Sequence, residues 1–174
     1  HSRPAIGPET TLTANPPTPI RLETHMAAVF AYGSLMYEPV LAALLQRVPV
    51  VRPALLSGYE RRVISGRVYP AILPTTASSA VKGLVLEGLS EYECMLLDDY
   101  EDESYQKRAV RVVPDGTEQE EECFCYVWNA STTMLGSELW DPEVHFLPHL
   151  EAYVEMSEGW RLEFEQGAGG GTRC

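Results

Sequence analysis

The sequence has no long apolar run and no excess of basic side chains. None of its apolar runs approaches the roughly 18 residues of a membrane-spanning helix. Thirteen Lys and Arg side chains stand against 25 Asp and Glu, which gives a formal net charge of −12. Nucleic acid and anionic membrane surfaces select for the opposite sign, so neither is expected as a partner.

Cysteine is also scarce. The four cysteines, at 94, 123, 125 and 174, are too few for a disulfide framework in a chain of 174 residues. Cys123 and Cys125 lie in a strand-like run that places both thiols on one face, and no further ligands at metal-site spacing accompany them. We interpret the cysteines as reduced and structural, with no metal site. A cytoplasmic location is therefore expected, and an organelle is the alternative if residues 1–25 are the remnant of a targeting segment.

Composition divides the chain into three parts. Residues 1–25 contain five prolines, little apolar material and no hydrophobic segment of a signal peptide, which predicts a disordered leader or linker. Residues 167–174, GAGGGTRC, have the composition of a flexible glycine-rich tail. Residues 26–166 are left as one folded domain, large enough to bury roughly two-thirds of its unfolded surface.

Within this domain, apolar patterning predicts strands over 28–31, 55–65, 68–72, 81–87, 106–113 and 122–128. Helices are predicted over 38–46, 90–99 and 143–156, the last interrupted at Pro148. The helix at 90–99 opens with Ser90-Glu91-Tyr92-Glu93, a capping-box pattern. Short strands, few helices and no regular βαβ alternation favour an α+β domain, a small barrel with helices outside it.

The junction Tyr32-Gly33-Ser34-Leu35 joins the first predicted strand to the first predicted helix. A strand that ends in a glycine turn before a helix leaves backbone N–H groups without partners, all pointing one way. Such groups suit an anion, either a phosphate or a substrate carboxylate. From the residues alone, a plain loop in which Gly33 serves only the turn is the simpler interpretation.

Four carboxylates follow the second predicted helix, at Asp98, Asp99, Glu101 and Asp102. In so acidic a protein most carboxylates are solvated surface groups. The apolar neighbours of this cluster nevertheless indicate a packed helix end, which can draw one carboxylate into a semi-apolar pocket. Its pKa would then be raised, and it could act as a general base. Spacing alone does not select which of the four it is.

Other candidates are weaker. His145 and His149 flank Pro148 and lack the pattern of a zinc-protease helix, so we interpret them as surface or core residues. The pairs 61–62 and 107–108 are basic, and by default they are solvated strand positions. Ser34 lacks the glycines of a nucleophile elbow, and no phosphate-binding or dinucleotide-binding glycine pattern is present.

Taken in order, FAYGSLM, GR-YPAI-P, V-G-L and LDDYE---Y-R--V-V form a combination that resembles the gamma-glutamylamine cyclotransferase-like proteins. These are the branch of the gamma-glutamyl cyclotransferase superfamily that includes plant avirulence-induced proteins. The match runs from about Val29 to Trp160. YGSL and LDDYE, about 65 residues apart, are specific only as a pair.

The resemblance implies a gamma-glutamyl cyclotransferase-like fold, a small mixed β-barrel flanked by helices. It also selects one carboxylate, because the family's catalytic glutamate follows Leu-Asp-Asp-aromatic and so falls on Glu101. The residues that it implies for the gamma-glutamyl moiety are Tyr32, Gly33, Ser34 and Leu35, with Met36 and Tyr37 extending the loop along the pocket.

The implied reaction is an acyl transfer within a small-molecule substrate, a gamma-glutamyl amine or peptide. The α-amine attacks the γ-carbonyl and 5-oxoproline is released, with Glu101 accepting a proton and then donating it to the leaving amine. Neither a metal nor an organic cofactor is required. The leaving group stays open between a lysine isopeptide, another amine, an amino acid and glutathione. A non-catalytic domain that serves as a binding or scaffold module in a larger assembly is the alternative.

Overall fold

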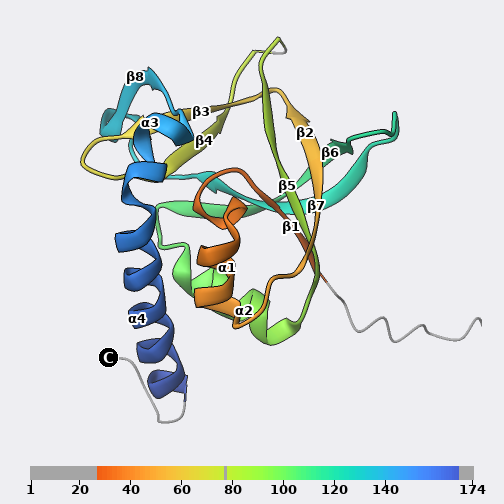
Figure 1. The fold of residues 1–174 in the computed structure, drawn as a ribbon. Coiled ribbons are helices and arrows are strands. Elements are labelled where there is room, and N and C mark those ends of the chain that lie inside the picture. The colour runs from red at the N-terminus through yellow and green to blue at the C-terminus, as the bar shows by residue number, and fades with distance from the viewer. Residues whose placement is uncertain (1–26, 77, 169–174) are drawn as a thin grey trace, which may run out of the picture.

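The computed structural model describes residues 27–76 and 78–168. The predicted leader or linker over 1–25 lies outside the described residues, as do Cys174 and most of the predicted tail. In the described part, a closed five-stranded barrel stands beside a three-stranded sheet, with helices packed against both (Figure 1). This α+β arrangement confirms the fold class that the sequence predicts.

The barrel contains most of the predicted strands. Its strands, in spatial order, are β1 (Ala27–Ala31), β5 (Ala80–Leu89), β2 (Val50–Ser57), β6 (Tyr105–Pro114) and β7 (Glu121–Trp128). Neighbouring strands are antiparallel except where β1 closes the barrel against β7 in parallel, with Val29 opposite Phe124. The hairpin β6–β7 has the two strands that the sequence predicts on either side of an acidic turn.

The second sheet differs from the prediction. Its order is β4 (Pro70–Pro74), β3 (Tyr59–Ile64) and β8 (Leu135–Leu139). The single strand predicted over 55–65 is two strands, because the chain turns at Gly58, whose φ of 80° suits glycine. The sequence analysis missed β8, since Leu-Gly-Ser-Glu-Leu has no strand pattern; pairing with β3 at the edge of the sheet defines it.

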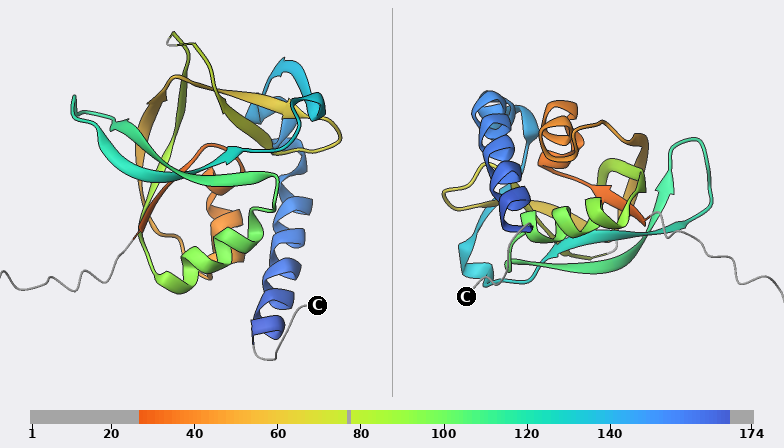
Figure 2. Two further views of the ribbon diagram at one scale, coloured as in Figure 1. Left: turned by 180° about the vertical axis from the view of Figure 1, so that it is seen from behind. Right: turned by 90° about the horizontal axis from the view of Figure 1, so that it is seen from below.

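The helices gather on one side of the barrel, where α1 and α2 lie near each other and α4 runs alongside them (Figures 1 and 2). The α-helices are α1 (Glu38–Leu45), α2 (Glu91–Tyr100), α3 (Pro142–His145) and α4 (Leu150–Ala168). The 3-10 segments are η1 (Ser34–Met36), η2 (Thr132–Met134) and η3 (Leu147–His149). The break predicted at Pro148 is therefore present, within η3.

The C-terminal helix is longer than predicted. α4 continues past the expected end at 156 and includes Gly167 and Ala168, which the sequence analysis placed in the tail. No proline follows Pro148, and a lone glycine near a helix end costs only about 1 kcal/mol relative to alanine.

The start of α2 is fixed by the predicted capping box. The Ser90 hydroxyl accepts a hydrogen bond from the Glu93 N–H at 3.1 Å, and the Glu93 carboxylate accepts one from the Ser90 N–H at 3.0 Å. Arg47, just after α1, also donates to the Glu93 carboxylate at 2.6 Å. These bonds tie α2 to the end of α1, and so they help to place the far end of α2, where Glu101 follows.

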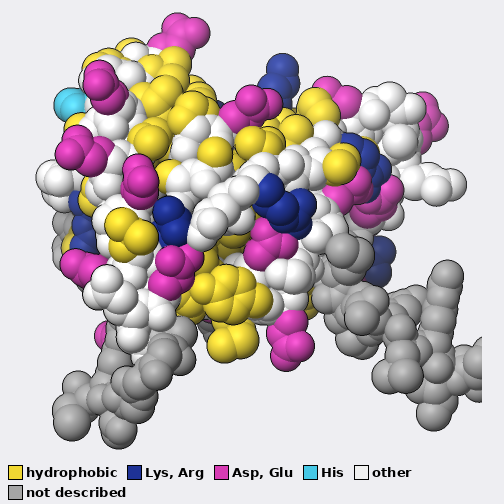
Figure 3. Space-filling model, turned by 60° about the horizontal axis from the view of Figure 1, so that its bottom comes forward, with side chains coloured by type: hydrophobic (Ala, Val, Ile, Leu, Met, Phe, Trp, Pro, Cys, Tyr) yellow, Lys and Arg dark blue, Asp and Glu magenta, His cyan; other side chains and the backbone are white. Residues whose placement is uncertain are grey.

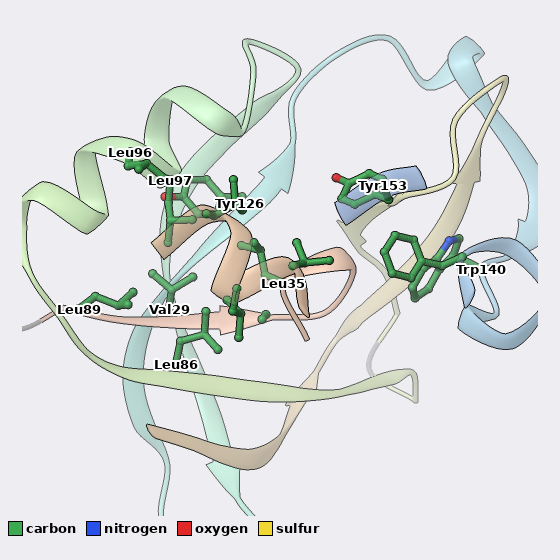
Figure 4. Packing of buried hydrophobic residues seen from close by; sticks show 14 residues of the cluster. Val29, Leu35, Leu86, Leu89, Leu96, Leu97, Tyr126, Trp140 and Tyr153 are labelled. Atoms are coloured by element: carbon green, nitrogen blue, oxygen red, sulfur yellow. The ribbon is translucent and has the colours of Figure 1, made fainter. Parts of the chain in front are cut away.

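The buried residues form two main clusters, and β1 contributes to both. Val29 and Ala31 face the helices, whereas Phe30 and Tyr32 face the barrel interior, as alternation along a strand requires. On the helix side, Val29 lies between the buried leucines of α2 and those of β5 (Figure 4). The loop that follows β1 therefore starts from a strand whose two faces are both packed, one against the helices and one in the barrel interior.

The surface is mixed in charge. On the face that Figure 3 shows, acidic side chains are spread over the molecule, with basic ones lying among them rather than in one basic patch. Among the described residues, no helix is long and apolar enough to cross a membrane.

Candidate active site

One pocket collects residues from the β1–α1 loop, the end of α2, the barrel and α4. Its empty space, open solvent at the mouth included, is about 690 Å³. Its lining consists of Phe30, Ala31, Tyr32, Gly33, Ser34, Leu35, Tyr69, Pro70, Tyr100, Glu101, Asp102, Tyr105, Tyr126, Tyr153, Met156 and Trp160. Of the described residues in this lining, only Glu101 and Asp102 are acidic, and none is Lys, Arg or His.

The loop after β1 has free backbone donors at the wall of this pocket. The N–H groups of Met36 and Tyr37 close the 3-10 turn on the carbonyls of Gly33 and Ser34, at 3.1 and 3.3 Å. The N–H groups of Gly33, Ser34 and Leu35 have no acceptor among the described residues. Three successive donors at the pocket wall form a site in which an anionic oxygen could bind.

Two long-range contacts hold this loop. Arg61 on β3 donates to the Tyr32 carbonyl at 2.9 Å, while its guanidinium packs over the Trp140 ring, 5.0 Å from the centroid. The Tyr32 hydroxyl donates to the Tyr126 carbonyl of β7. The sequence analysis interprets Arg61 as a solvated strand position. In the structure it is instead partly buried, and its hydrogen bond holds the start of the loop.

Gly33 is required by a close approach and not by a positive φ. A Cβ at this position would lie 2.8 Å from Cδ and 3.0 Å from Cγ of Pro70, at the start of β4, while its φ is −132°. Pro70 also lines the pocket. Any side chain at position 33 would therefore displace either the loop or the opposite wall.

Glu101 follows directly on α2, as its C-cap, with its N–H bonded to the Leu97 carbonyl at 2.9 Å. Burial, and secondly the charge of Asp102, raise the pKa of Glu101 to about 8. The semi-apolar surroundings that the sequence analysis expected for one carboxylate of this cluster are therefore those of Glu101. A carboxyl group with such a pKa can exchange a proton near neutral pH.

The other carboxylates of the cluster lie differently. Asp98 is exposed, accepts from the Tyr126 hydroxyl at 2.7 Å and pairs with Lys107 at 3.1 Å. Asp102 is exposed at the pocket, 3.8 Å from a guanidinium nitrogen of Arg67. Asp99 is exposed as well.

Two of the predicted binding residues lie outside the pocket lining. Met36 and Tyr37 pack against the buried cluster on the helix side, and the Tyr37 ring lies 5.0 Å from that of Phe146. The cause is the 3-10 turn, which directs the chain away from the pocket after Leu35. The extension of the binding loop to Met36 and Tyr37 therefore gains no support from the lining of this pocket and stays a prediction.

The sequence analysis missed most of the aromatic wall. Tyr69 and Tyr105 fall inside the segments quoted for the family resemblance, which was a signal for them. Tyr153, Met156 and Trp160 come from α4 and belong to no local motif. Only the tertiary fold brings them to the pocket.

No group of three or more His, Cys, Asp or Glu side chains able to hold a metal occurs in the described ranges. Cys94, Cys123 and Cys125 are free thiols. Burial raises the pKa of the Cys123 thiol to about 11 and raises that of Cys125 as well, which keeps both protonated.

Comparison with known proteins agrees with the fold. A family profile described as gamma-glutamyl cyclotransferase, AIG2-like, matches residues 29–143. The chain therefore belongs to the gamma-glutamyl cyclotransferase, AIG2-like family. AIG2-like protein D of Arabidopsis thaliana is 37% identical over 139 residues, which cover 79% of this chain and 91% of that protein.

Solved structures show the same likeness. A solution structure of an Arabidopsis thaliana protein matches with a TM-score of 0.59 at 30% identity, over 75% of this chain and 87% of that one. A solved gamma-glutamyl cyclotransferase matches with a TM-score of 0.56 at 16% identity, over 82% of this chain and 85% of that one. At that identity the second likeness concerns the fold alone.

Proposed function

We propose that the protein is a gamma-glutamyl cyclotransferase that acts on gamma-glutamyl amines or peptides and releases 5-oxoproline. The observation that carries this proposal is the single pocket that contains both a carboxyl group of raised pKa, Glu101, and the unpaired N–H groups of 33–35. Membership of the family supports the class of reaction.

The loop supplies the binding half of the proposal. The α-carboxylate of the glutamyl group would accept hydrogen bonds from the N–H groups of Gly33, Ser34 and Leu35. Neutral donors are the available means of holding it, because the pocket lining contains no Lys or Arg. Glycine at position 33 leaves Pro70 the space that a Cβ would occupy, so the loop can carry these donors close to the opposite wall. An N–H group that holds the carboxylate is not free to stabilise the oxyanion at the γ-carbonyl.

Glu101 supplies the proton transfer. An ordinary glutamate, with a pKa of about 4.3, is a poor acceptor for an ammonium proton, whereas burial brings Glu101 to about 8. Once its ammonium has given a proton to Glu101, the α-amine attacks the γ-carbonyl carbon, and the bond to the leaving nitrogen breaks. The lactam nitrogen keeps one hydrogen, and two protons in total pass to the leaving nitrogen, which departs as an ammonium.

Positioning accounts for much of the expected acceleration. Nucleophile and electrophile belong to the same molecule, so the enzyme has only to hold the glutamyl chain in its ring-closing conformation. The aromatic wall of the pocket is suited to this task, because its rings can pack against the methylene groups of the glutamyl chain.

The test is an assay for released 5-oxoproline on gamma-glutamyl-ε-lysine, gamma-glutamyl dipeptides and glutathione. Glu101→Gln protein serves as the blank, and Glu103→Gln, at an exposed carboxylate two residues away, is the matched control. Release by the wild type and by Glu103→Gln but not by Glu101→Gln supports the proposal, and the best substrate defines the leaving group. Folded wild-type protein that releases nothing from the whole panel refutes it and favours the scaffold alternative.

A further inference from the structure

A chain of four hydroxyl groups runs from the helices to the binding loop. The Tyr100 hydroxyl, at the end of α2, is 3.1 Å from that of Ser157 on α4. Tyr100 donates to the Tyr153 hydroxyl at 2.6 Å, and Tyr153 donates to the Ser34 hydroxyl oxygen at 3.2 Å. Three of the four residues, Tyr100, Tyr153 and Ser34, line the pocket.

The chain has a direction. Ser34 accepts from Tyr153, so its own hydrogen points elsewhere, either into the pocket or toward the Tyr100 hydroxyl, with which Ser34 also interacts. Burial raises the pKa of Tyr100 to about 12 and raises that of Tyr153 as well, so both hydroxyls keep their protons and remain donors. Ser157 is 0% exposed and Tyr153 is 8% exposed, so bulk water does not compete for these bonds.

We propose that Tyr153 is a positioning residue that acts through Ser34, turning the Ser34 hydroxyl into a donor to the bound gamma-glutamyl group. This inference rests on the proposed function. Ser34 would add one side-chain donor to the backbone donors of the loop. The orientation of its hydrogen would be decided by helix α4, which lies beyond the residues 29–143 matched by the family profile.

The ring and the hydroxyl of Tyr153 have separable roles. The ring packs edge-on against Phe146 at 5.0 Å and against Tyr69 at 6.3 Å, and so it anchors α4. The hydroxyl is turned toward the side of the site on which Leu35 and Tyr126 lie (Figure 4). Tyr153→Phe keeps the ring contacts and removes the hydroxyl, and with it the bond to Ser34 and the bond that Tyr100 donates.

The experiment is a double-mutant cycle in the 5-oxoproline assay with wild type, Tyr153→Phe, Ser34→Ala and the double variant. Each single change is expected to lower kcat/KM about tenfold, the scale of one hydrogen bond. The loss should lie mainly in KM, because the bond is made to the bound ground state. In the Ser34→Ala background, Tyr153→Phe should cost less than about twofold more, since its target is gone.

Tyr105→Phe is the control for a tyrosine of the same pocket outside the chain. Its hydroxyl donates to the Pro70 carbonyl at 2.8 Å, so its effect should add to that of Ser34→Ala. Equal losses from Tyr153→Phe with and without Ser34→Ala would overturn the inference. If Tyr153→Phe fails to fold, Tyr100→Phe takes its place, because it removes the hydrogen bond that Tyr100 donates to Tyr153. Its loss in kcat/KM should be smaller than that expected for Tyr153→Phe, and it must vanish when Ser34→Ala is also present.

Failure of the proposed function is distinguishable from failure of this inference. Wild-type protein without turnover refutes the first. The same cycle is then measured by calorimetry with 5-oxoproline and a gamma-glutamyl amine as ligands. Coupling between positions 34 and 153 in affinity supports the chain, and additive effects or no binding overturn it.

Discussion

The raised pKa of Glu101 leads to a prediction about stability that does not depend on turnover. Its pKa is higher in the folded than in the unfolded protein, so between about 4.5 and about 8 the folded state binds more protons. Stability then falls as pH rises through this window and is lowest above it, where the folded protein must hold a partly desolvated charge. In Glu101→Gln, the side chain at position 101 carries no charge at any pH. Its stability relative to the wild type should therefore increase as pH rises.

The size of the effect follows from the pKa. A rise in the pKa of Glu101 from 4.5 to about 8 corresponds to a loss of roughly 5 kcal/mol in the free energy of unfolding at high pH, because each pKa unit corresponds to about 1.4 kcal/mol. The Glu101 side chain is only partly buried, so solvent screens part of its charge. We therefore expect the stability of Glu101→Gln relative to the wild type to increase by only roughly 2 kcal/mol across this pH range. For a domain of this size that is a gain of about 4 to 8 °C in Tm at pH 9 over the difference measured at pH 4.5.

The assay is urea unfolding and thermal melting of wild type, Glu101→Gln and Glu103→Gln at half-unit intervals from pH 4.5 to 9. The control should follow the wild type, because Glu103 is exposed. A Glu101→Gln protein whose advantage is the same at both ends of the range would refute the reasoning, since Glu101 would then titrate alike in the folded and unfolded states.

Three further changes test other parts of the structure. Gly33→Val should lower affinity for a gamma-glutamyl ligand at least tenfold by calorimetry, because its Cβ would lie 2.8 Å from Pro70; unchanged affinity would remove the loop from the site. The profile of kcat/KM should rise with pH to about 8, the pKa of Glu101, and Asp102→Asn should move this limb to lower pH by removing a nearby charge; a limb that stays in place would show that Asp102 does not act on Glu101. Ser90→Ala should lose about 1 kcal/mol in urea unfolding with KM unchanged, because it removes the cap of α2; a stability equal to the wild type would show that this cap contributes nothing.

Much of the barrel could be predicted because it follows from local pattern. The hairpin of β6 and β7 shows as two apolar runs around a turn, and Ser90 with Glu93 marks the start of α2 chemically. By contrast, β8 has no apolar alternation and becomes a strand only through pairing with β3. Gly58 lies between two runs of strand-forming residues that read as one, so the turn at Gly58 could not be predicted from the pattern.

The residues of the candidate site likewise fall into two groups, those that a local motif predicts and those that only the tertiary fold brings together. The Tyr32–Leu35 loop and Glu101 are recognisable because each belongs to a short contiguous motif. Tyr153 is 119 positions from Ser34 in the chain, and no spacing rule connects them. Arg61 was read as a solvated strand residue, because only the fold reveals that the Tyr32 carbonyl lies beside it. The proposed site residues that belong to motifs can therefore be predicted from the sequence, and those that support them from a distance cannot.

The central claim is that Glu101 drives a cyclisation within one substrate. The most direct test is to incubate wild type, Glu101→Gln and Glu103→Gln with gamma-glutamyl-ε-lysine and to measure 5-oxoproline and lysine in the same samples. The account predicts equal molar amounts of both products from the wild type and Glu103→Gln, and neither from Glu101→Gln. Free glutamate in place of 5-oxoproline, or undiminished release by Glu101→Gln, would contradict it.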